Sequence, residues 1–310
     1  MTITPGIHDL TKDAYFADPT AEPSLSASII KILITETPIH AWTAHPRLNP
    51  NYERTEEDKF DLGNAAHALM LHDPQAFSIL QFDNWRTKDA QNAKAEARKA
   101  GKIPMLADNW QRVCDMVEAG RAQLLQHRDA SEAFANGKGE QTIIWQEGAT
   151  WFRSKLDWMP DKPTIFYDYK TTGSADPDTW QKIAFQTGAD IQAAFYRRGI
   201  RALELARNPR MRFVVQETTE PYALSVCEFS PESLELADRR IGHAIKKWEW
   251  CMKHHEWPGY PDRTVTLEAP PWHESQLMAR EQRDADLAKQ LGAKDDIELL
   301  AFAMKMQSPI

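Results

Sequence analysis

Apolar and polar residues interleave along two short runs in the middle of the chain, residues 151–159 and 164–171. Both runs are rich in aromatic and β-branched residues, which favours β-strands. The segment that separates them, residues 160–163 (PDKP), has the composition of a turn. Because two strands joined by so short a connection pair in antiparallel fashion, the pattern predicts a β-hairpin.

Apolar residues spaced three and four positions apart predict helices elsewhere in the chain. Ser26 or Ser28 is expected to cap the first of these helices, which should end before Pro38. The segment after the hairpin predicts a helix over residues 178–205 that is broken near Gly188. Further helices are predicted at about 58–72, 108–127, 231–255 and 274–306, and further strands at 140–145, 211–216 and 222–229.

The predicted hairpin carries residues that could bind a metal. Side chains alternate between the two faces of a strand, so Asp168 and Lys170 share one face of the second strand. Asp157 lies on the first strand, and a carboxylate on each strand is a ligand set that Mg²⁺ accepts. The lysine can orient or deprotonate an attacking water. The alternative is a solvated ladder of surface residues, because Asp-x-Lys is common by chance.

Two pairs of residues share helical faces. Gln192 and Tyr196 are four positions apart in the helix after the hairpin. Gly63 precedes His67 by one turn in the predicted helix over 58–72. Glycine permits the close approach of a second backbone, and imidazole can bind a metal or contact phosphate. Taken alone, a histidine on an apolar helix is more often a satisfied core residue.

Composition limits the functional classes. The chain has 310 residues, of which 42% are hydrophobic and 26% charged, as in soluble globular proteins. No apolar run approaches the ~20 residues that span a bilayer, and the start has no signal-peptide profile, so a cytoplasmic location is expected. The net charge of −8 makes DNA binding by the whole surface unfavourable. An acidic exterior can nevertheless surround a basic channel.

The three cysteines are far apart in the sequence and odd in number: Cys114, Cys227 and Cys251. They argue against a disulfide framework and against a zinc site built from paired Cys-x-x-Cys motifs. An iron–sulfur cluster bound by four cysteines is excluded for the same reason.

The order of the motifs resembles the nuclease core of the PD-(D/E)XK superfamily. More narrowly, it is similar to the RecB-type branch and, within that branch, to the phage and prophage exonucleases of the RecE (exonuclease VIII) type. The second acidic position is Asp where Glu is commoner. The resemblance covers roughly residues 24–260 and rests on a Ser-x-Ser helix at Ser26, Gly63-x-x-x-His67, Asp157, Asp168-Tyr169-Lys170 and Gln192-x-x-x-Tyr196.

The resemblance implies an α/β (α+β) fold. A central mixed β-sheet flanked by helices would form a restriction-endonuclease-like core with helical additions on its N-terminal side. The implied organisation is an extended lead-in (1–23), a nuclease domain (24–260) with a helical part (24–138) and a catalytic core (139–260), and a C-terminal strand and helix extension (261–310).

The resemblance also implies a role for each residue of the motifs. Lys170 would act on the attacking water, while Gln192 and Tyr196 would assist from the neighbouring helix. The metal would be Mg²⁺, with Mn²⁺ as a substitute, and no iron–sulfur cluster is expected. The implied metal ligands are His67, Asp157, Asp168 and the backbone carbonyl of Tyr169, with Glu140 as an outer ligand or water-positioning group.

The activity implied is hydrolysis of DNA from duplex ends, 5′ to 3′, in phage-type recombination or DNA end processing. Enzymes of this type form homo-oligomeric rings and work beside a single-strand annealing protein. Three alternatives stay open: a structure-specific endonuclease, a noncatalytic DNA- or protein-binding module on a nuclease fold, and a Cas4-like nuclease, which the missing cysteines disfavour. Some of six arginines are expected to reach phosphates: Arg197, Arg198, Arg201, Arg207, Arg210 and Arg212.

Overall fold

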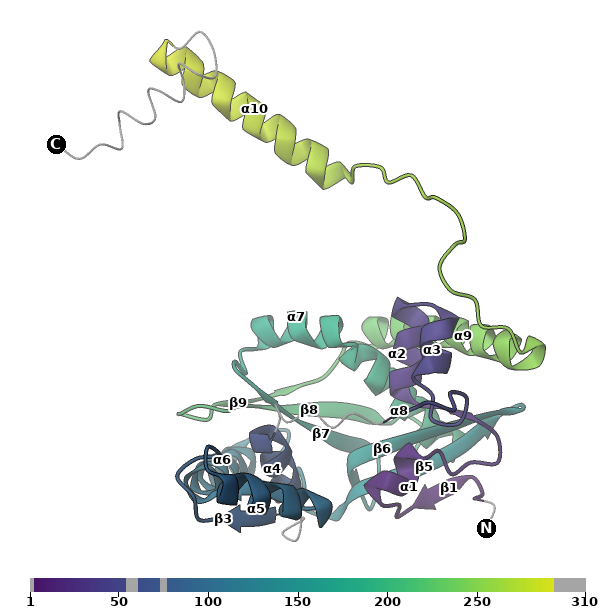
Figure 1. The fold of residues 1–310 in the computed structure, drawn as a ribbon, viewed down its shortest axis with the longest axis vertical. Coiled ribbons are helices and arrows are strands. Elements are labelled where there is room, and N and C mark those ends of the chain that lie inside the picture. The colour runs from purple at the N-terminus through teal and green to yellow at the C-terminus, as the bar shows by residue number, and fades with distance from the viewer. Residues whose placement is uncertain (1–2, 54–60, 73–76, 293–310) are drawn as a thin grey trace, which may run out of the picture. The chain divides into compact units, whose positions relative to one another are not determined.

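A mixed β-sheet with helices on both faces forms the centre of the protein (Figure 1). The computed structural model describes residues 3–53, 61–72 and 77–292. The chain divides into two compact units, residues 1–259 and 260–310, and the sheet lies in the first. The α/β fold expected from the sequence is confirmed. Among the helices described, none combines the length and the apolar character needed to cross a membrane.

Six strands of the main sheet follow the order β1-β5-β6-β7-β8-β9, and β2 pairs with β6 beside this path. Neighbouring strands are antiparallel except for the pairs β7–β8 and β2–β6, which are parallel. The strands are β1 (Gly6–His8), β2 (Ser24–Leu25), β5 (Gly137–Glu147), β6 (Thr150–Pro160), β7 (Ile165–Thr172), β8 (Arg210–Glu217) and β9 (Leu224–Cys227).

The sheet forks at one edge of β6. β5 pairs along the whole of the opposite edge of β6. On the forked edge, β6 pairs with β7 next to the turn, where Trp158 lies opposite Tyr167. Further along the same edge, Ser24 of β2 lies opposite Trp151. The predicted antiparallel hairpin is therefore confirmed, but its two strands diverge and β2 occupies the edge that β7 leaves.

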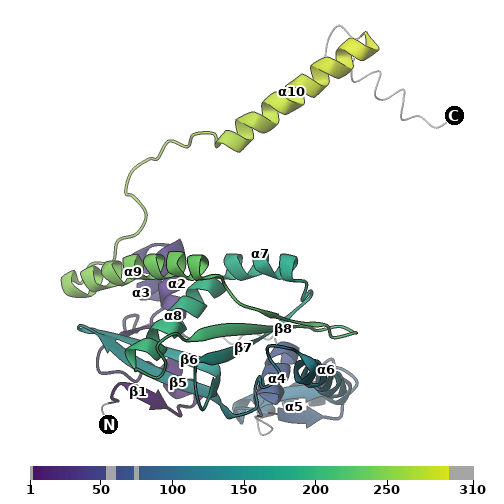
Figure 2. The ribbon, with the colours of Figure 1, turned by 180° about the vertical axis from the view of Figure 1, so that it is seen from behind.

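Helices cover the two faces of the sheet, and the views from the front and from behind agree on which helix lies on which face (Figure 2). Strand alternation sends Phe166 into the core beneath α2, α8 and α9, and Tyr167 into the core beneath α4 and α6. The helices on the first face are α2 (Ala27–Thr35), α3 (Pro38–Thr43), α7 (Pro177–Thr187), α8 (Ala189–Ala202) and α9 (Pro231–His254). Those on the second face are α4 (Asp61–Met70) and α6 (Ala107–Gln126).

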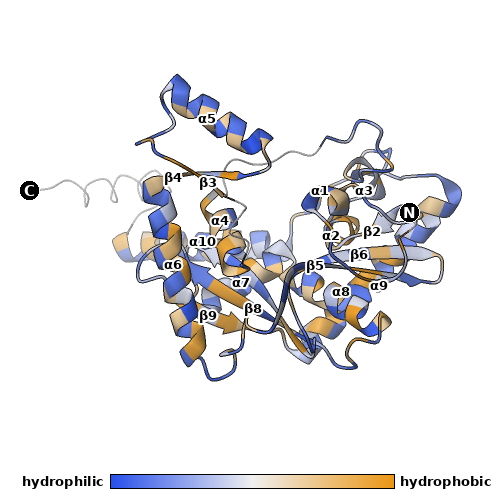
Figure 3. Cartoon of the chain, turned by 90° about the horizontal axis from the view of Figure 1, so that it is seen from below, coloured by the Kyte–Doolittle hydropathy of each residue, from blue (hydrophilic) through white to orange (hydrophobic). Residues whose placement is uncertain are grey.

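A small parallel sheet, β3 (Phe77–Leu80) with β4 (Ile103–Leu106), lies beside α4 and α6. Helix α5 (Lys88–Lys99) connects its two strands, and Figure 3 shows hydrophilic and hydrophobic residues alternating along this helix. Phe77 contacts Trp110 of α6, with ring centroids 4.6 Å apart, so the small sheet is joined to the second core.

Local signals in the sequence set several helix ends as predicted. The Ser26 hydroxyl accepts the N–H of Ile29 and caps α2. Gly188 adopts a left-handed conformation (φ 69°) and separates α7 from α8 at the predicted break. Glycine reaches this conformation without the steric cost that a Cβ imposes. The predicted helix after Ser230 is confirmed as α9, which Ser230 caps.

The two ends of the chain differ from the expectation. The lead-in is not merely extended, because Gly6–His8 pairs with β5 and α1 (Lys12–Phe16) follows. These elements are too short to show a periodicity. No strand forms in the described part of the C-terminal extension, where Val265 and Leu267 are exposed. Helix α10 (Pro271–Leu291) forms there, and the rest of the helix predicted over 274–306 lies outside the described residues.

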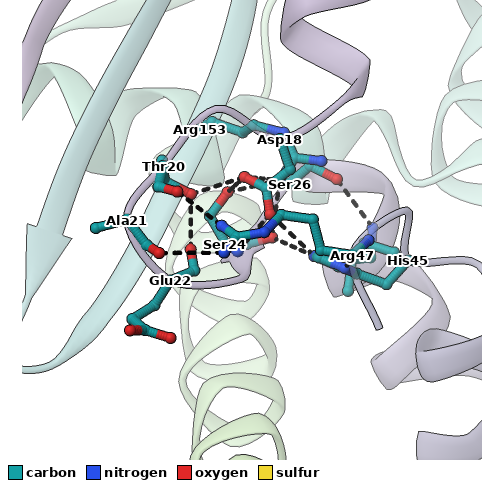
Figure 4. Close-up of polar contacts among 10 residues, drawn as sticks. Asp18, Thr20, Ala21, Glu22, Ser24, Ser26, His45, Arg47 and Arg153 are labelled. Atoms are coloured by element: carbon teal, nitrogen blue, oxygen red, sulfur yellow. Dashed lines mark hydrogen bonds and ion pairs between the residues drawn. The ribbon is translucent and has the colours of Figure 1, made fainter. Parts of the chain in front are cut away.

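A buried ionic network attaches β2 to β6 (Figure 4). Asp18 is fully buried, and its Oδ1 lies 3.0 Å from Nη1 of Arg153, a residue of β6. The Ser24 backbone N–H donates to Asp18 Oδ2 at 2.9 Å, and the hydroxyls of Ser24 and Thr20 donate to Oδ1. Because a buried carboxylate is stable only when it is paired and hydrogen-bonded, this network fixes the position of Ser24 at the fork.

His45 completes the network as a neutral imidazole. Its Nδ1 accepts the backbone N–H of Arg47 at 3.2 Å, so that nitrogen carries no proton. Its Nε2 lies 3.1 Å from the Ser24 carbonyl, to which it donates. Burial, together with the charges of Arg153 and Arg47, outweighs the attraction of Asp18 and lowers the pKa of His45 to about 4.

The folded state should lose stability as His45 is protonated. The pKa in the folded protein lies below the ordinary value of 6.5, so the contribution is complete above pH 6.5 and decreases as the pH falls toward 4. We expect the free energy of unfolding to fall by about 3 kcal/mol over this window through His45. Urea titrations of the wild type and of His45→Gln measure it.

The His45→Gln variant is the matched control, because glutamine can accept from Arg47 and donate to the Ser24 carbonyl but does not titrate. The difference in unfolding free energy between the two proteins should change across pH 6.5 to 4. A constant difference would show that His45 does not take up a proton on unfolding.

Candidate functional site

Charged side chains from four elements converge where β6 and β7 diverge. Asp157 comes from β6, Asp168 and Lys170 from β7, His67 from α4 and Glu140 from β5. At the fork, the ladder between β6 and β7 is interrupted, and the Asp157 carboxylate accepts the Tyr169 backbone N–H at 2.9 Å. A side chain thus replaces a strand partner, which holds Asp157 against β7.

His67, Asp157 and Glu140 form a set of three groups able to bind a metal. His67 Nε2 lies 2.9 Å from Asp157 Oδ2, and His67 Nδ1 lies 3.6 Å from Glu140 Oε1. One ligand atom from each of the three residues lies within 4.8 Å of the others. The structure therefore brings together three of the residues predicted as metal ligands.

Close packing of α4 on β7 places His67 at this position. Gly63 lies one turn before His67, and a Cβ atom at position 63 would lie 2.8 Å from Thr171 Oγ1 of β7. That distance is shorter than a carbon–oxygen contact allows, so only glycine lets the helix approach this closely without a shift. A close approach was expected at Gly63, but the atom that meets it is a side-chain oxygen of β7 and not a second backbone.

Glu140 has an unusual backbone conformation within a strand. Its φ is 56°, in the left-handed region, and the β5–β6 ladder skips the pair Glu140 and Asp157 between regular pairs on either side. Non-glycine residues in this region cost about 1 kcal/mol or more and cluster at functional sites. Lys155 secures the residue: its Nζ lies 3.1 Å from Glu140 Oε2 and donates to the Glu140 carbonyl at 2.8 Å.

Asp168 contacts Lys170 and a residue of α8. Its Oδ2 lies 2.5 Å from Lys170 Nζ, and its Oδ1 accepts the Gln192 side-chain amide at 2.7 Å. A further hydrogen bond joins Gln192 to Tyr196. Asp168 is fully buried, yet its Oδ2 receives no hydrogen bond of good geometry from any described residue. The predicted assisting pair is thus arranged behind Asp168, one helical turn apart.

Tyr169 points to the opposite face and is braced from behind. Its hydroxyl donates to Gln216 Oε1 at 2.6 Å, and the Gln216 amide donates to the Met116 carbonyl of α6 at 2.7 Å. A Cβ at Gly120 of α6 would lie 2.6 Å from Gln216 Oε1, so glycine leaves the space for this side chain. These contacts fix the backbone between Asp168 and Lys170.

Asp157 and Asp168 have opposite pKa shifts. Burial raises the pKa of Asp157, but the charge of His67, its hydrogen bond, and Lys170 outweigh burial and hold this pKa at about 2. Burial and the neighbouring Asp157 carboxylate raise the pKa of Asp168 to about 6, against the attraction of Lys170. The two carboxylates therefore differ in their affinity for a proton although they lie in one site.

The two cations of the site respond to this charge. Burial lowers the pKa of His67, but Asp157, Glu140 and Asp168 together raise it to about 9. Burial also lowers the pKa of Lys170, and the attraction of Asp168 and Asp157 exceeds this effect, so its pKa lies above the ordinary value. In the metal-free protein, Lys170 is an ammonium group that can donate hydrogen bonds.

These residues fit a hard divalent cation. Carboxylate oxygens and one imidazole nitrogen are ligands that Mg²⁺ and Mn²⁺ accept. Asp168 is a further carboxylate beside these residues, although its Oδ2 is paired with Lys170 in the metal-free protein. His67, Asp157 and Glu140 would hold the ion, with Asp168 beside them.

Several site residues were not found from the sequence. Lys155, which secures Glu140, was placed on the hairpin but given no role. Lys31 of α2 lies near Lys170 and Asp168, and the signal for it was a single charged residue in an otherwise uncharged helix.

Four of the arginines expected to reach phosphates bind other groups of the protein. Arg197 donates to the Pro209 carbonyl, Arg198 pairs with Glu147 and Asp238, and Arg210 and Arg212 pair with Glu228.

Gly63→Ala should weaken metal binding without unfolding the protein. Alanine favours a helix by about 1 kcal/mol over glycine. The added methyl group, however, would push α4 away from Thr171 and move His67 by tenths of an ångström. We expect metal affinity to fall roughly tenfold, since sub-ångström displacements have effects of this order. Isothermal titration with Mn²⁺ measures the affinity.

The double variant Gly63→Ala/Thr171→Ala removes the clash and should recover most of the affinity, while Thr171→Ala alone serves as the control. If the double variant binds Mn²⁺ as weakly as Gly63→Ala, the packing of α4 on β7 does not set the position of His67.

One protein family and several solved structures are similar to this chain. A family described as a PDDEXK-like domain of unknown function (DUF3799) matches residues 26–268. No curated protein matches significantly. Among solved structures, a protein from Eubacterium rectale called a "Putative exonuclease" is similar over 85% of this chain and 97% of its own, with 12% identity and a TM-score of 0.54.

A second solved structure, a phage-related exonuclease from Haemophilus somnus 129PT, matches over 75% of this chain and 96% of its own, with 10% identity and a TM-score of 0.31. At this identity, the likeness to the Eubacterium rectale protein concerns the fold. The family model covers most of the chain and agrees with the superfamily that the motifs resemble. The chain belongs to the family of PDDEXK-like domains and has a nuclease fold.

Proposed function

We propose that the protein is a metal-dependent exodeoxyribonuclease that hydrolyses phosphodiester bonds from the ends of duplex DNA. The observation that carries the proposal is the convergence of His67, Glu140 and Asp157 beside the Asp168–Lys170 pair at the fork. An ordinary ion pair or surface ladder does not require a buried aspartate close enough to a second aspartate for the second to raise its pKa. A site that binds a cation and a phosphodiester does require such a pair of carboxylates.

The residues have separate roles in this proposal. His67, Asp157, Glu140 and Asp168 bind Mg²⁺ or Mn²⁺, with the Tyr169 carbonyl as a further ligand. The ion lowers the pKa of a bound water and neutralises charge on the scissile phosphate. Lys170 orients the attacking water or donates to a phosphoryl oxygen. Gln192, braced by Tyr196, fixes Asp168 through the hydrogen bond to its Oδ1.

The direction and the biological setting come from the RecE-type resemblance. We infer 5′ to 3′ degradation that leaves a 3′ single strand, in phage-type recombination or DNA end processing in the cytoplasm. The same inference includes assembly of the protein into a homo-oligomeric ring and a single-strand annealing protein as its partner. The solved protein from Eubacterium rectale supports an exonuclease by name alone.

Divalent metal should stabilise the protein through Asp157. A ligand at a hundredfold excess over its Kd contributes about 2.7 kcal/mol, which raises the melting temperature of a domain of this size by about 5 °C or more. We expect this shift with Mg²⁺ and Mn²⁺ in differential scanning fluorimetry. Asp157→Asn should abolish the shift, whereas Asp161→Asn, in the exposed hairpin turn, should keep it. Equal shifts in both variants would place the metal elsewhere.

The activity itself is tested with a linear duplex labelled at one 5′ end. With Mg²⁺ we expect early release of the 5′ label, no release with EDTA, and no cutting of a closed circular duplex. Lys170→Met should lower the rate by 10²-fold or more, because it removes a donor from the reacting centre. Lys182→Met, an exposed lysine of α7, is the control and should cleave normally.

The other outcomes separate the alternatives. Cutting of circular and linear duplex at equal rates would support a structure-specific endonuclease, and release from the 3′ end would reverse the direction. DNA binding without cleavage in Mg²⁺ or Mn²⁺ would support a noncatalytic module on a nuclease fold.

A further inference from the structure

Lys155 of β6 is held in one position by three oxygens beside the candidate metal site. Its Nζ donates to the Leu10 carbonyl at 3.2 Å and to the Glu140 carbonyl at 2.8 Å, and it lies 3.1 Å from Glu140 Oε2. An ammonium group has three N–H donors, so these three oxygens account for all of them. The side chain is only 14% exposed. Lys155 is therefore a fixed cation whose donors are already engaged.

One of the three oxygens comes from the N-terminal lead-in. β1 pairs with β5 in a register that sets His8 opposite Thr142. Continued by two residues, the same register would set Leu10 opposite Glu140. The pairing ends before this point, and the Lys155 ammonium joins the two carbonyls instead. Because the family model begins at residue 26, the contacts around Glu140 include a part of the chain that precedes the matched segment.

The two carboxylate oxygens of Glu140 face different partners. Oε2 faces Lys155, whereas Oε1 lies 3.6 Å from His67 Nδ1. The Glu140 side chain is 43% exposed, so without a partner it would have several rotamers available. Its backbone lies in the left-handed region, at φ 56°, which is unfavourable unless other contacts compensate. A single group, the Lys155 ammonium, contacts both the backbone and the side chain of this residue.

We propose that Lys155 is a positioning residue, which holds Glu140 in the conformation that completes the metal-binding set with His67 and Asp157. This inference rests on the proposed metal-dependent function. A group that hydrogen-bonds a metal ligand orients that ligand and thereby tunes metal affinity. Lys155 acts only through Glu140, since its donors are used within the protein.

Charge and position predict opposite effects for Lys155→Met. Loss of a positive charge beside a cation site strengthens the attraction of the site for a divalent ion, so charge alone predicts tighter binding. Loss of the contacts releases Glu140, so positioning predicts weaker binding. Removal of a group that orients a metal ligand typically costs about 10- to 100-fold in affinity. The direction of the change therefore distinguishes the two roles.

Isothermal titration of the full chain with Mn²⁺ tests the proposal, with melting temperatures as a check on folding. We expect about tenfold weaker binding in Lys155→Met. Lys155→Arg keeps the charge and the N–H donors and should bind more tightly than Lys155→Met. Lys155→Gln is too short to make all three contacts and should also bind weakly, which serves the test if Lys155→Met does not fold. Lys138→Met, at an exposed position of β5 near Glu140, removes a charge without these contacts and should bind at least as tightly as the wild type.

A double-mutant cycle with Glu140→Gln separates positioning from a general loss of structure. If Lys155 acts through Glu140, Lys155→Met should cause little further loss of Mn²⁺ affinity in the Glu140→Gln background. A structural defect elsewhere would add to the effect of Glu140→Gln. Additive losses, or unchanged or tighter binding in Lys155→Met, would overturn the proposal for Lys155. Absence of Mn²⁺ binding by the wild type would instead overturn the proposed metal-dependent function itself, so the two failures are distinguishable.

Discussion

Repulsion between the carboxylates of Asp157 and Asp168 is the constraint on which the centre of this protein depends. Bringing such groups together in a low-dielectric interior is unfavourable unless cations and donors surround them. The fold supplies these from different elements: His67 from α4, Lys170 from β7 and the Tyr169 N–H from an interrupted ladder. Each depends on a separate packing contact, so the site requires the whole first unit rather than one motif.

The forked edge of β6 makes this arrangement possible. A hairpin paired along its full length would use the Tyr169 N–H in the ladder and would leave no space between the strands. Where the strands diverge, β7 no longer pairs with the edge of β6. β2 pairs with this edge instead, and the buried ion pair of Asp18 and Arg153 holds it there. Such a pair is costly to break but specifies one position for the attached segment. The fork thus converts an edge that would otherwise be unpaired into a fixed support for the site.

Local features of the sequence were sufficient for the hairpin, the break at Gly188, the cap at Ser26 and the start of the helix after Ser230, because each depends on residues a few positions apart. The spacing of Gly63 and His67 was also informative by itself, because the two residues lie one helical turn apart. The short strands β1 and β2 could not be predicted, since two or three residues show no periodicity and their partners lie more than 100 residues away. The hydrogen bond between Gln192 and Asp168 likewise depends on the packing of α8 against the sheet, which the pattern of strand faces does not encode.

The brace behind Tyr169 links positions that are far apart in the sequence. The Tyr169 hydroxyl donates to the side-chain oxygen Oε1 of Gln216. The Gln216 side chain in turn fits only because position 120 is a glycine. A change at any one of the three leaves a buried polar group unpaired or creates a collision. Natural variation at positions 120, 169 and 216 should therefore be correlated, and a homologue with a larger residue at position 120 should carry a shorter one at position 216.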